Sequence, residues 1–213
     1  NGIELCRYPA KAAAKIISSD NLFVSSDDQK ILDAAKLEGY LPIKRPQNIS
    51  GNKAQHIDAI MHGLSVIESQ IGAIDILVVM LANSVTIKSR WIKEGIDIIK
   101  EDPSVSAVVP AYQEQDHHPY RARRLTKSGF LEPYFNFEDT NLSTNRQDLP
   151  ANYFLSHNFW VLNKSKSLQS TSGWQPWNFM GEKVKPIKVT NCFDVHDLED
   201  IKKSEKWLSE KGR

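Results

Sequence analysis

Residues 74–81 (IDILVVML) constrain the fold more than any other part of this sequence. After Asp75 the run is continuously apolar and does not alternate with polar residues. Such a run is typical of a strand covered on both faces, whereas a sheet with one wet face alternates. The segment therefore predicts a central strand in an α/β fold.

Strand-like and helix-like segments alternate on both sides of this run. Short apolar runs of strand type occupy residues 21–25, 41–44, 105–109, 159–162 and 184–189. Apolar residues at helical spacing occupy residues 27–35, 57–67, 92–99 and 198–208. This alternation predicts a mainly parallel sheet with helices on both faces and a ligand crevice at the carboxyl ends of the strands.

Length and charge limit the partners that this chain could have. Its 213 residues suit one main domain, and 27 Lys and Arg against 26 Asp and Glu give a net charge of +1. That balance offers no general attraction to nucleic acid or to an anionic membrane, and the sequence lacks an apolar run of membrane-spanning length. Cys6 and Cys192 lie far apart with no CxxC, so we expect buried thiols in a cytoplasmic protein.

The alternation stops near residue 115. Residues 115–151 are polar and rich in Arg, Asn and Pro. This stretch is too long for an ordinary loop and predicts an inserted subdomain or arm. It contains a basic cluster at Arg121, Arg123 and Arg124, which could bind an anion or be a solvated face. His117 and His118 precede this cluster, and we interpret them as structural or as hydrogen-bonding residues.

Polar residues follow several predicted strands. Ser25 and Asp27 follow the first strand, and Asp27 is predicted to cap the next helix. Asn83 and Ser84 follow the central strand, where the Ser84 hydroxyl could serve a ligand or a turn equally well. Arg45 could bind a phosphate or a nucleobase, or be a solvated loop residue.

An acidic corner lies at residues 192–200 (CFDVHDLED). If the corner begins as a strand, Asp194 and His196 point to the same side, where a hard cation could bind. Asp197 precedes Leu198 and is predicted to be a helix N-cap. Spacing alone leaves metal ligation and helix capping equally open.

Six segments, in this order, resemble the motifs of one family: VSSDDQKILDAAKLEGY, KRPQNISGNKA, MLANSVTIKS, DHHPYR, NRQDLP and FDVHDLED. They are similar to segments of the CMP-sialic acid synthetases (acylneuraminate cytidylyltransferases), which activate nine-carbon 2-keto sugar acids. The resemblance implies a Rossmann-like three-layer nucleotidyltransferase fold over residues 1–213. It also implies a homodimer formed through an inserted dimerisation and sugar-binding arm at residues 119–156.

The implied reaction transfers CMP from CTP to the anomeric hydroxyl of a sialic-acid-like 2-keto sugar acid and releases pyrophosphate. The resemblance places the nucleotide at Arg45, Ser84, Asn83 and Ser25. It places the sugar acid at Arg146, Arg121, Ser156 and Trp177. Asp194 and Arg146 match catalytic positions, and Asp194, with His196, would bind Mg²⁺ or Mn²⁺.

The sequence also departs from the family pattern. His196 replaces a second metal-binding Asp, which leaves a mixed ligand set or an indirect role for the imidazole. After NRQDLP, residues 154–157 (FLSH) replace Arg-Pro-Asn-Gly, so we expect a different sugar. The family's first strand and basic Gly-rich phosphate loop have no counterpart, and we expect them to precede Asn1 in the intact protein. The alternatives are a nucleotidyltransferase for a different sugar, or a non-catalytic nucleotide-binding or dimeric assembly homologue.

Overall fold

The computed structural model describes residues 2–51, 53–136, 142–192 and 194–211. The chain divides into two compact units: a larger one formed by Asn1–Pro110 with Ser156–Arg213, and a smaller one formed by Ala111–Leu155. The arm expected at residues 119–156 therefore lies within the smaller unit, except for Ser156. None of the helices in the described part of the chain is long and apolar enough to cross a membrane.

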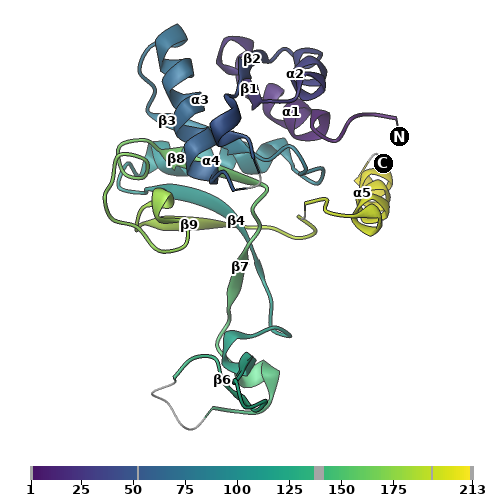
Figure 1. The fold of residues 1–213 in the computed structure, drawn as a ribbon, viewed down its shortest axis with the longest axis vertical. Helices are drawn as coiled ribbons and strands as arrows, with labels where there is room; N and C mark the ends of the chain where they lie inside the picture. Colours follow the sequence, from purple (N-terminus) through teal and green to yellow (C-terminus); the bar gives the residue numbers. More distant parts are fainter. Residues whose placement is uncertain (1, 52, 137–141, 193, 212–213) are drawn as a thin grey trace. The chain divides into compact units, whose positions relative to one another are not determined.

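The larger unit alternates strands and helices along the chain (Figure 1). Its strands are β1 (Phe23–Ser26), β2 (Leu41–Lys44), β3 (Ile76–Met80), the first part of β4 (Ala107–Gln113), β8 (Phe159–Asn163) and β9 (Val184–Lys188). Its α-helices are α1 (Arg7–Ala14), α2 (Gln29–Lys36), α3 (His56–Ile71), α4 (Ser89–Glu101) and α5 (Leu198–Lys211). The predicted α/β fold class is confirmed.

Strand β8 lies between β3 and β4 and is antiparallel to both. Strands β3 and β4 therefore run in the same direction, with Val161 of β8 paired to Val78 on one side and Val108 on the other. Strand β9 pairs with β4. The parallel pair β1 and β2 forms a separate two-stranded sheet.

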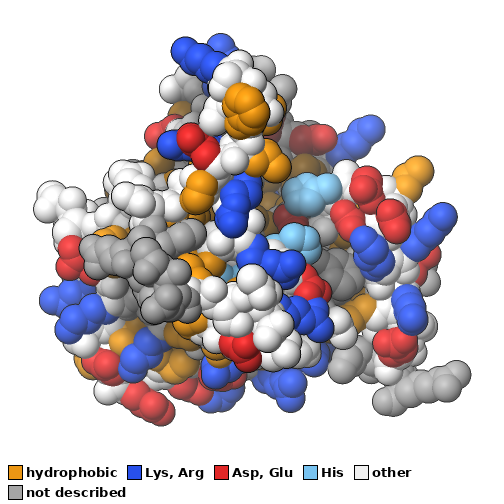
Figure 2. Space-filling model, turned by 90° about the horizontal axis from the view of Figure 1, so that it is seen from below, with side chains coloured by type: hydrophobic (Ala, Val, Ile, Leu, Met, Phe, Trp, Pro, Cys, Tyr) orange, Lys and Arg blue, Asp and Glu red, His pale blue; other side chains and the backbone are white. Residues whose placement is uncertain are grey.

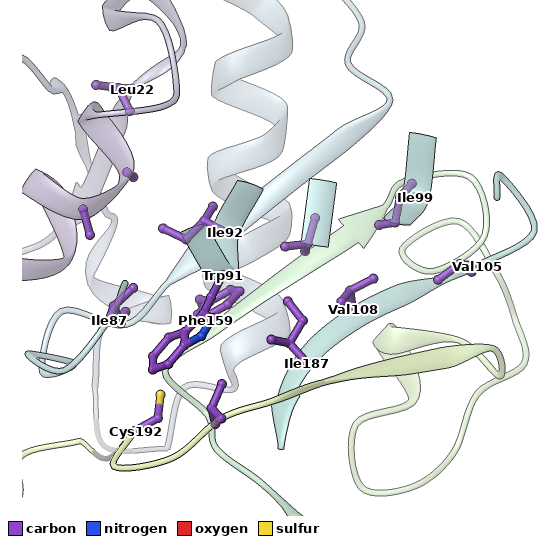
Figure 3. Packing of buried hydrophobic residues seen from close by; sticks show 14 residues of the cluster. Leu22, Ile87, Trp91, Ile92, Ile99, Val105, Val108, Phe159, Ile187 and Cys192 are labelled. Carbon is purple, nitrogen blue, oxygen red and sulfur yellow. The ribbon is translucent and has the colours of Figure 1, made fainter. Parts of the chain in front are cut away.

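Helix α4 covers one face of the larger sheet. Its Trp91 and Ile92 belong to the same buried cluster as Phe159 and Val161 of β8 (Figure 3). Gly95 allows this close approach, because a Cβ at that position would lie 2.8 Å from Cγ2 of Val161. Burial of these large apolar side chains supplies the main stabilisation of the unit.

The neighbouring side chain on β8 points the other way. Trp160 is 1% exposed, and its ring contacts His56 at the start of α3 and Phe179 of the short 3₁₀ turn Asn178–Met180. This alternation along β8 is the ordinary two-residue period of a strand. It places two of the chain's histidine rings, His56 and His157, beside one tryptophan.

Strand β3 is less covered than its sequence predicted. All five of its residues are partly exposed, because β1 is not hydrogen-bonded to it. Pockets of about 160, 270 and 320 Å³ separate the two strands, and Phe23 and Val78 line all three. The predicted central position was therefore wrong within the described sheets, because β3 pairs with β8 and lies at the edge of its sheet, although its position in the sequence was predicted closely.

The smaller unit is built on hairpins. The end of β4 pairs antiparallel with β7 (Tyr153–Leu155), and β5 (Arg123–Leu125) pairs antiparallel with β6 (Leu131–Pro133). Gly129, with a φ of 87°, forms the turn between β5 and β6, a conformation that favours glycine. Leu125, Phe130 and Leu131 of this hairpin are each 71% exposed.

Candidate functional site

Arg45 and Ser25 meet at the carboxyl ends of β1 and β2. The parallel register brings these ends together, and Arg45 N–H donates to the Ser26 carbonyl at 3.0 Å. The Arg45 guanidinium donates from Nη2 to the Ser25 carbonyl (2.6 Å) and from Nε to Ser25 Oγ (3.3 Å). Two residues predicted for the nucleotide side are thus in direct contact.

Both residues line the pocket of about 320 Å³ between β1, α3 and β3. The rest of its wall is mostly apolar, including Ile60 and Leu64 of α3, and Trp160 with His56 completes it. An apolar pocket with one arginine and a few polar groups suits a flat ring that carries an anionic group.

The turn after β3 is tied to the acidic corner. The backbone carbonyl of Asn83 accepts from Val195 N–H at 2.9 Å, and the side-chain Nδ2 of Asn83 donates to the Val195 carbonyl at 3.3 Å. Ser84 is fully buried, and its hydroxyl has no hydrogen-bond partner among the described residues. A ligand could reach that hydroxyl only after this turn moved.

The acidic corner is irregular rather than a strand where it is described. Asp194 and His196 therefore do not meet by strand alternation, and that reasoning was wrong. They nevertheless pair, with His196 Nε2 at 2.8 Å from Asp194 Oδ2. Phe193, between the cysteine and Asp194, lies outside the described residues.

Asp197 caps helix α5, as predicted. Its Oδ1 accepts from the backbone N–H of Glu199 (2.8 Å) and of Asp200 (2.9 Å). Asp200 accepts in turn from His196 N–H at 3.1 Å, which lowers the pKa of Asp200. The other predicted cap was wrong by one residue, because Asp28 rather than Asp27 caps α2 through Lys30 N–H.

Asp194 could supply one carboxylate to a metal. No group of three or more His, Cys, Asp or Glu residues is arranged to hold a metal in the part of the chain that the structure describes. Mg²⁺ can bind one carboxylate when waters and substrate phosphates supply its other ligands. His196 Nε2 lies beside one Asp194 oxygen, so its position suits an orienting role as well as ligation.

His157 was missed as a site residue by sequence reasoning. Its ring lies 4.2 Å from the Trp177 ring and 5.9 Å from the Trp160 ring, centroid to centroid. Burial lowers the pKa of His157; Asp194 opposes this shift and His56 adds to it. The only signal was its replacement of a glycine after NRQDLP. On the face drawn in Figure 2, histidine side chains reach the surface next to acidic ones.

Ser156, predicted on the sugar side, is buried in a polar network. Its hydroxyl lies 2.8 Å from the Cys192 carbonyl oxygen and also contacts Asn158 Oδ1, which accepts from Cys192 Sγ at 2.9 Å. Ser156 is 6% exposed, and burial raises the pKa of the Cys192 thiol to about 12. The network joins the segment just before β8 to the acidic corner and leaves the Ser156 hydroxyl little access to a ligand.

The two sugar-side arginines meet within the smaller unit. Arg146 forms an ion pair with the Asp116 carboxylate, and Arg121 Nη1 lies 3.5 Å from the Asp116 carbonyl oxygen. His118 is structural, as predicted: its Nδ1 accepts from Tyr120 N–H, and its Nε2 contacts the Pro150 carbonyl oxygen at 3.0 Å. One acidic residue therefore holds both arginines at one place in this unit.

Comparisons with known proteins identify the fold. No protein-family model matches the sequence. A CMP:2-keto-3-deoxy-manno-octonic acid synthetase complexed with CTP superposes with a TM-score of 0.63 at 9% identity, over 97% of this chain and 88% of that one. The 4-diphosphocytidyl-2C-methyl-D-erythritol synthase of Anaerococcus prevotii superposes with a TM-score of 0.62 at 10% identity, over 98% and 87%. The chain therefore has the Rossmann-like nucleotidyltransferase fold of these proteins.

Proposed function

We propose that the protein is a cytidylyltransferase that transfers CMP from CTP to the anomeric hydroxyl of a sialic-acid-like 2-keto sugar acid. The observation that carries the proposal is the pocket of about 320 Å³ between β1, α3 and β3, whose wall reaches the carboxyl ends of β1 and β2, where Arg45 is bound to Ser25. In an open α/β sheet this is the place for a ligand crevice. Both structural neighbours are named for cytidylyl chemistry, and the sequence motifs resemble those of acylneuraminate cytidylyltransferases.

The nucleotide side of the proposed reaction follows from the pocket. The apolar wall would take the cytosine or ribose, and Arg45 would donate hydrogen bonds to a phosphate or to the base. The anomeric oxygen of the sugar acid would attack the α-phosphorus as the bond to pyrophosphate breaks. Mg²⁺ or Mn²⁺ bound at Asp194 would offset the charge on the phosphates.

The sugar side would use the arginines of the smaller unit. Arg146 and Arg121 would bind the carboxylate of the sugar acid, since a guanidinium matches a carboxylate in shape and charge. We propose that a second copy of the chain packs against this unit. Its exposed apolar residues Leu125, Phe130 and Leu131 support such a homodimer.

Pyrophosphate release tests the proposal. CTP, Mg²⁺ and a panel of 2-keto sugar acids with eight or nine carbons, incubated with the intact gene product, should yield pyrophosphate with at least one member. Arg45→Met should raise the KM for CTP by about tenfold or more, because a charge-assisted hydrogen bond is lost. Arg90→Met on α4 is the matched control, since Arg90 is exposed and does not line the pocket.

The panel also separates the alternatives. Turnover with only an eight-carbon acid, or with a sugar phosphate added to the panel, would assign a different sugar to the same chemistry. Tight CTP binding without turnover of any acceptor would overturn the enzyme proposal in favour of a nucleotide-binding homologue.

A further inference from the structure

A further pocket lies at the other end of the larger sheet, where β4 begins. Its volume is about 410 Å³, and it is lined by five serines, two lysines and one glutamate. None of these residues lines the pocket that contains Arg45. The polar lining distinguishes it from the three apolar pockets between β1 and β3.

Ser106, one of the serines that line this pocket, has a buried hydroxyl without a hydrogen-bond partner among the described residues. Ser106 is 2% exposed. Its backbone is fixed, because Ser106 N–H donates to the Lys183 carbonyl at 3.0 Å. A buried hydroxyl without a partner destabilises a protein, so such groups commonly mark a place where something else binds.

Gly181 packs closely against Ser106 and Lys166. Gly181 has a φ of 73°, and a Cβ there would lie 2.5 Å from the Lys166 carbonyl oxygen and 2.6 Å from Ser106 Cβ. Only glycine allows this close approach at a positive φ. This contact fixes the Ser106 side chain and the Lys166 backbone next to each other. Close packing therefore holds this part of the pocket wall in place.

The charge of the pocket favours an anion. Lys166 and Lys183 both line it, and neither forms an ion pair in the described structure. Glu182 is the one acidic residue in the lining. Asp102 lies nearby, but its carboxylate already accepts from Lys185 (3.2 Å) and from Ser104 Oγ (2.7 Å).

The remaining serines can accept hydrogen bonds. Ser165 Oγ donates to Asn163 Oδ1 at 3.0 Å, and Ser170 Oγ lies 3.1 Å from Ser172 Oγ. Their oxygens keep lone pairs that a ligand hydroxyl could use. The pocket therefore combines donors for an anion with acceptors for hydroxyl groups, and its volume exceeds that of a lone phosphate ion.

We propose that this pocket binds a small phosphorylated polyol, such as a sugar phosphate, with the phosphate near Ser106, Lys166 and Lys183. Lysine ammonium groups and hydroxyls are ordinary phosphate ligands. The proposal is independent of the cytidylyltransferase activity. Its ligand chemistry follows from the side chains that line the pocket.

Calorimetric titration of the full chain tests this assignment with glucose 6-phosphate, inorganic phosphate and glucose as probes. Glucose 6-phosphate should bind with a Kd about fivefold or more below that of inorganic phosphate, and glucose should not bind at about 10 mM. Ser106→Ala should weaken glucose 6-phosphate binding by about fivefold while Tm stays level or rises, because an unpaired buried hydroxyl is removed. Lys166→Met with Lys183→Met should weaken it by about tenfold or more.

Lys30→Met on α2 is the matched control, since Lys30 does not line the pocket, and it should bind like the wild type. No binding of glucose 6-phosphate at about 10 mM would overturn the assignment. Equal affinity in the control and the double-lysine variant would also overturn it. A loss that appears with Arg45→Met instead would place the phosphate in the other pocket.

Discussion

Asp194→Asn should separate catalysis from stability. When His196 is protonated, it and Asp194 carry opposite unit charges 2.8 Å apart (Nε2 to Oδ2), which attract by about 1.5 kcal/mol in water and about 6 kcal/mol at an effective dielectric of 20. The His196 side chain is 71% exposed and that of Asp194 is 32% exposed, so solvent screens the pair strongly. Exposed pairs of this kind contribute about 0–1 kcal/mol. The substitution should therefore lower Tm by no more than about 4 °C.

The same substitution should have a much larger effect on turnover. Loss of a carboxylate that holds the metal against the phosphates should lower kcat by about 100-fold or more, which corresponds to about 2.7 kcal/mol. Pyrophosphate release at increasing Mg²⁺ and Mn²⁺ concentrations measures this loss, and calorimetry measures Tm in parallel. His196→Asn is the control, because it removes the ion pair but keeps the carboxylate, and it should lose less than about tenfold.

Activity of Asp194→Asn within about threefold of the wild type would exclude a metal-binding role for the Asp194 carboxylate. So would equal losses in Asp194→Asn and His196→Asn, because the effect would then belong to the pair and not to the carboxylate.

Three further substitutions test the structure around the site. Ser156→Ala should lower the free energy of unfolding by about 1–3 kcal/mol in urea denaturation, because the buried Cys192 carbonyl loses a polar neighbour; an unchanged midpoint would contradict the network. His157→Gln should flatten the pH dependence of stability: burial lowers the pKa of His157 in the folded state, so wild-type stability should fall as the pH drops below about 6.5, where the unfolded chain takes up the proton first. Parallel pH profiles of the two proteins would count against this. Asp197→Ala should destabilise the protein by about 1 kcal/mol and increase amide exchange in the first turn of α5, whereas unchanged exchange there would exclude the cap.

Local patterns predicted the elements well but not their pairing. The apolar run at residues 74–81 predicted β3, and residues 159–162 predicted β8, because both runs are strand-length and bounded by polar residues. That β8 lies antiparallel between β3 and β4 depends on contacts far apart in the sequence, which no local pattern encodes. For the same reason the sequence did not predict the open space between β1 and β3.

In the candidate site, too, features that depend on neighbouring residues were predictable and contacts between distant residues were not. The N-cap at Asp197 was predictable, because capping depends on residues within one helical turn. Strand alternation predicted that Asp194 and His196 lie on the same side, but the segment is irregular and not a strand, so their contact has another cause. The contact between His157 and Trp177 joins residues that lie on either side of β8 in the sequence, so only the folded chain brings them together.

The identity of the product shows whether the protein transfers CMP to a 2-keto sugar acid. The intact protein should be incubated with CTP, ATP, GTP or UTP, each with the 2-keto sugar acid that gives pyrophosphate, and the products should be separated and weighed by mass spectrometry. We expect a single CMP-linked sugar acid, formed from CTP in a divalent-metal-dependent reaction. Free CMP without a sugar adduct, or equal products from all four nucleotides, would contradict it.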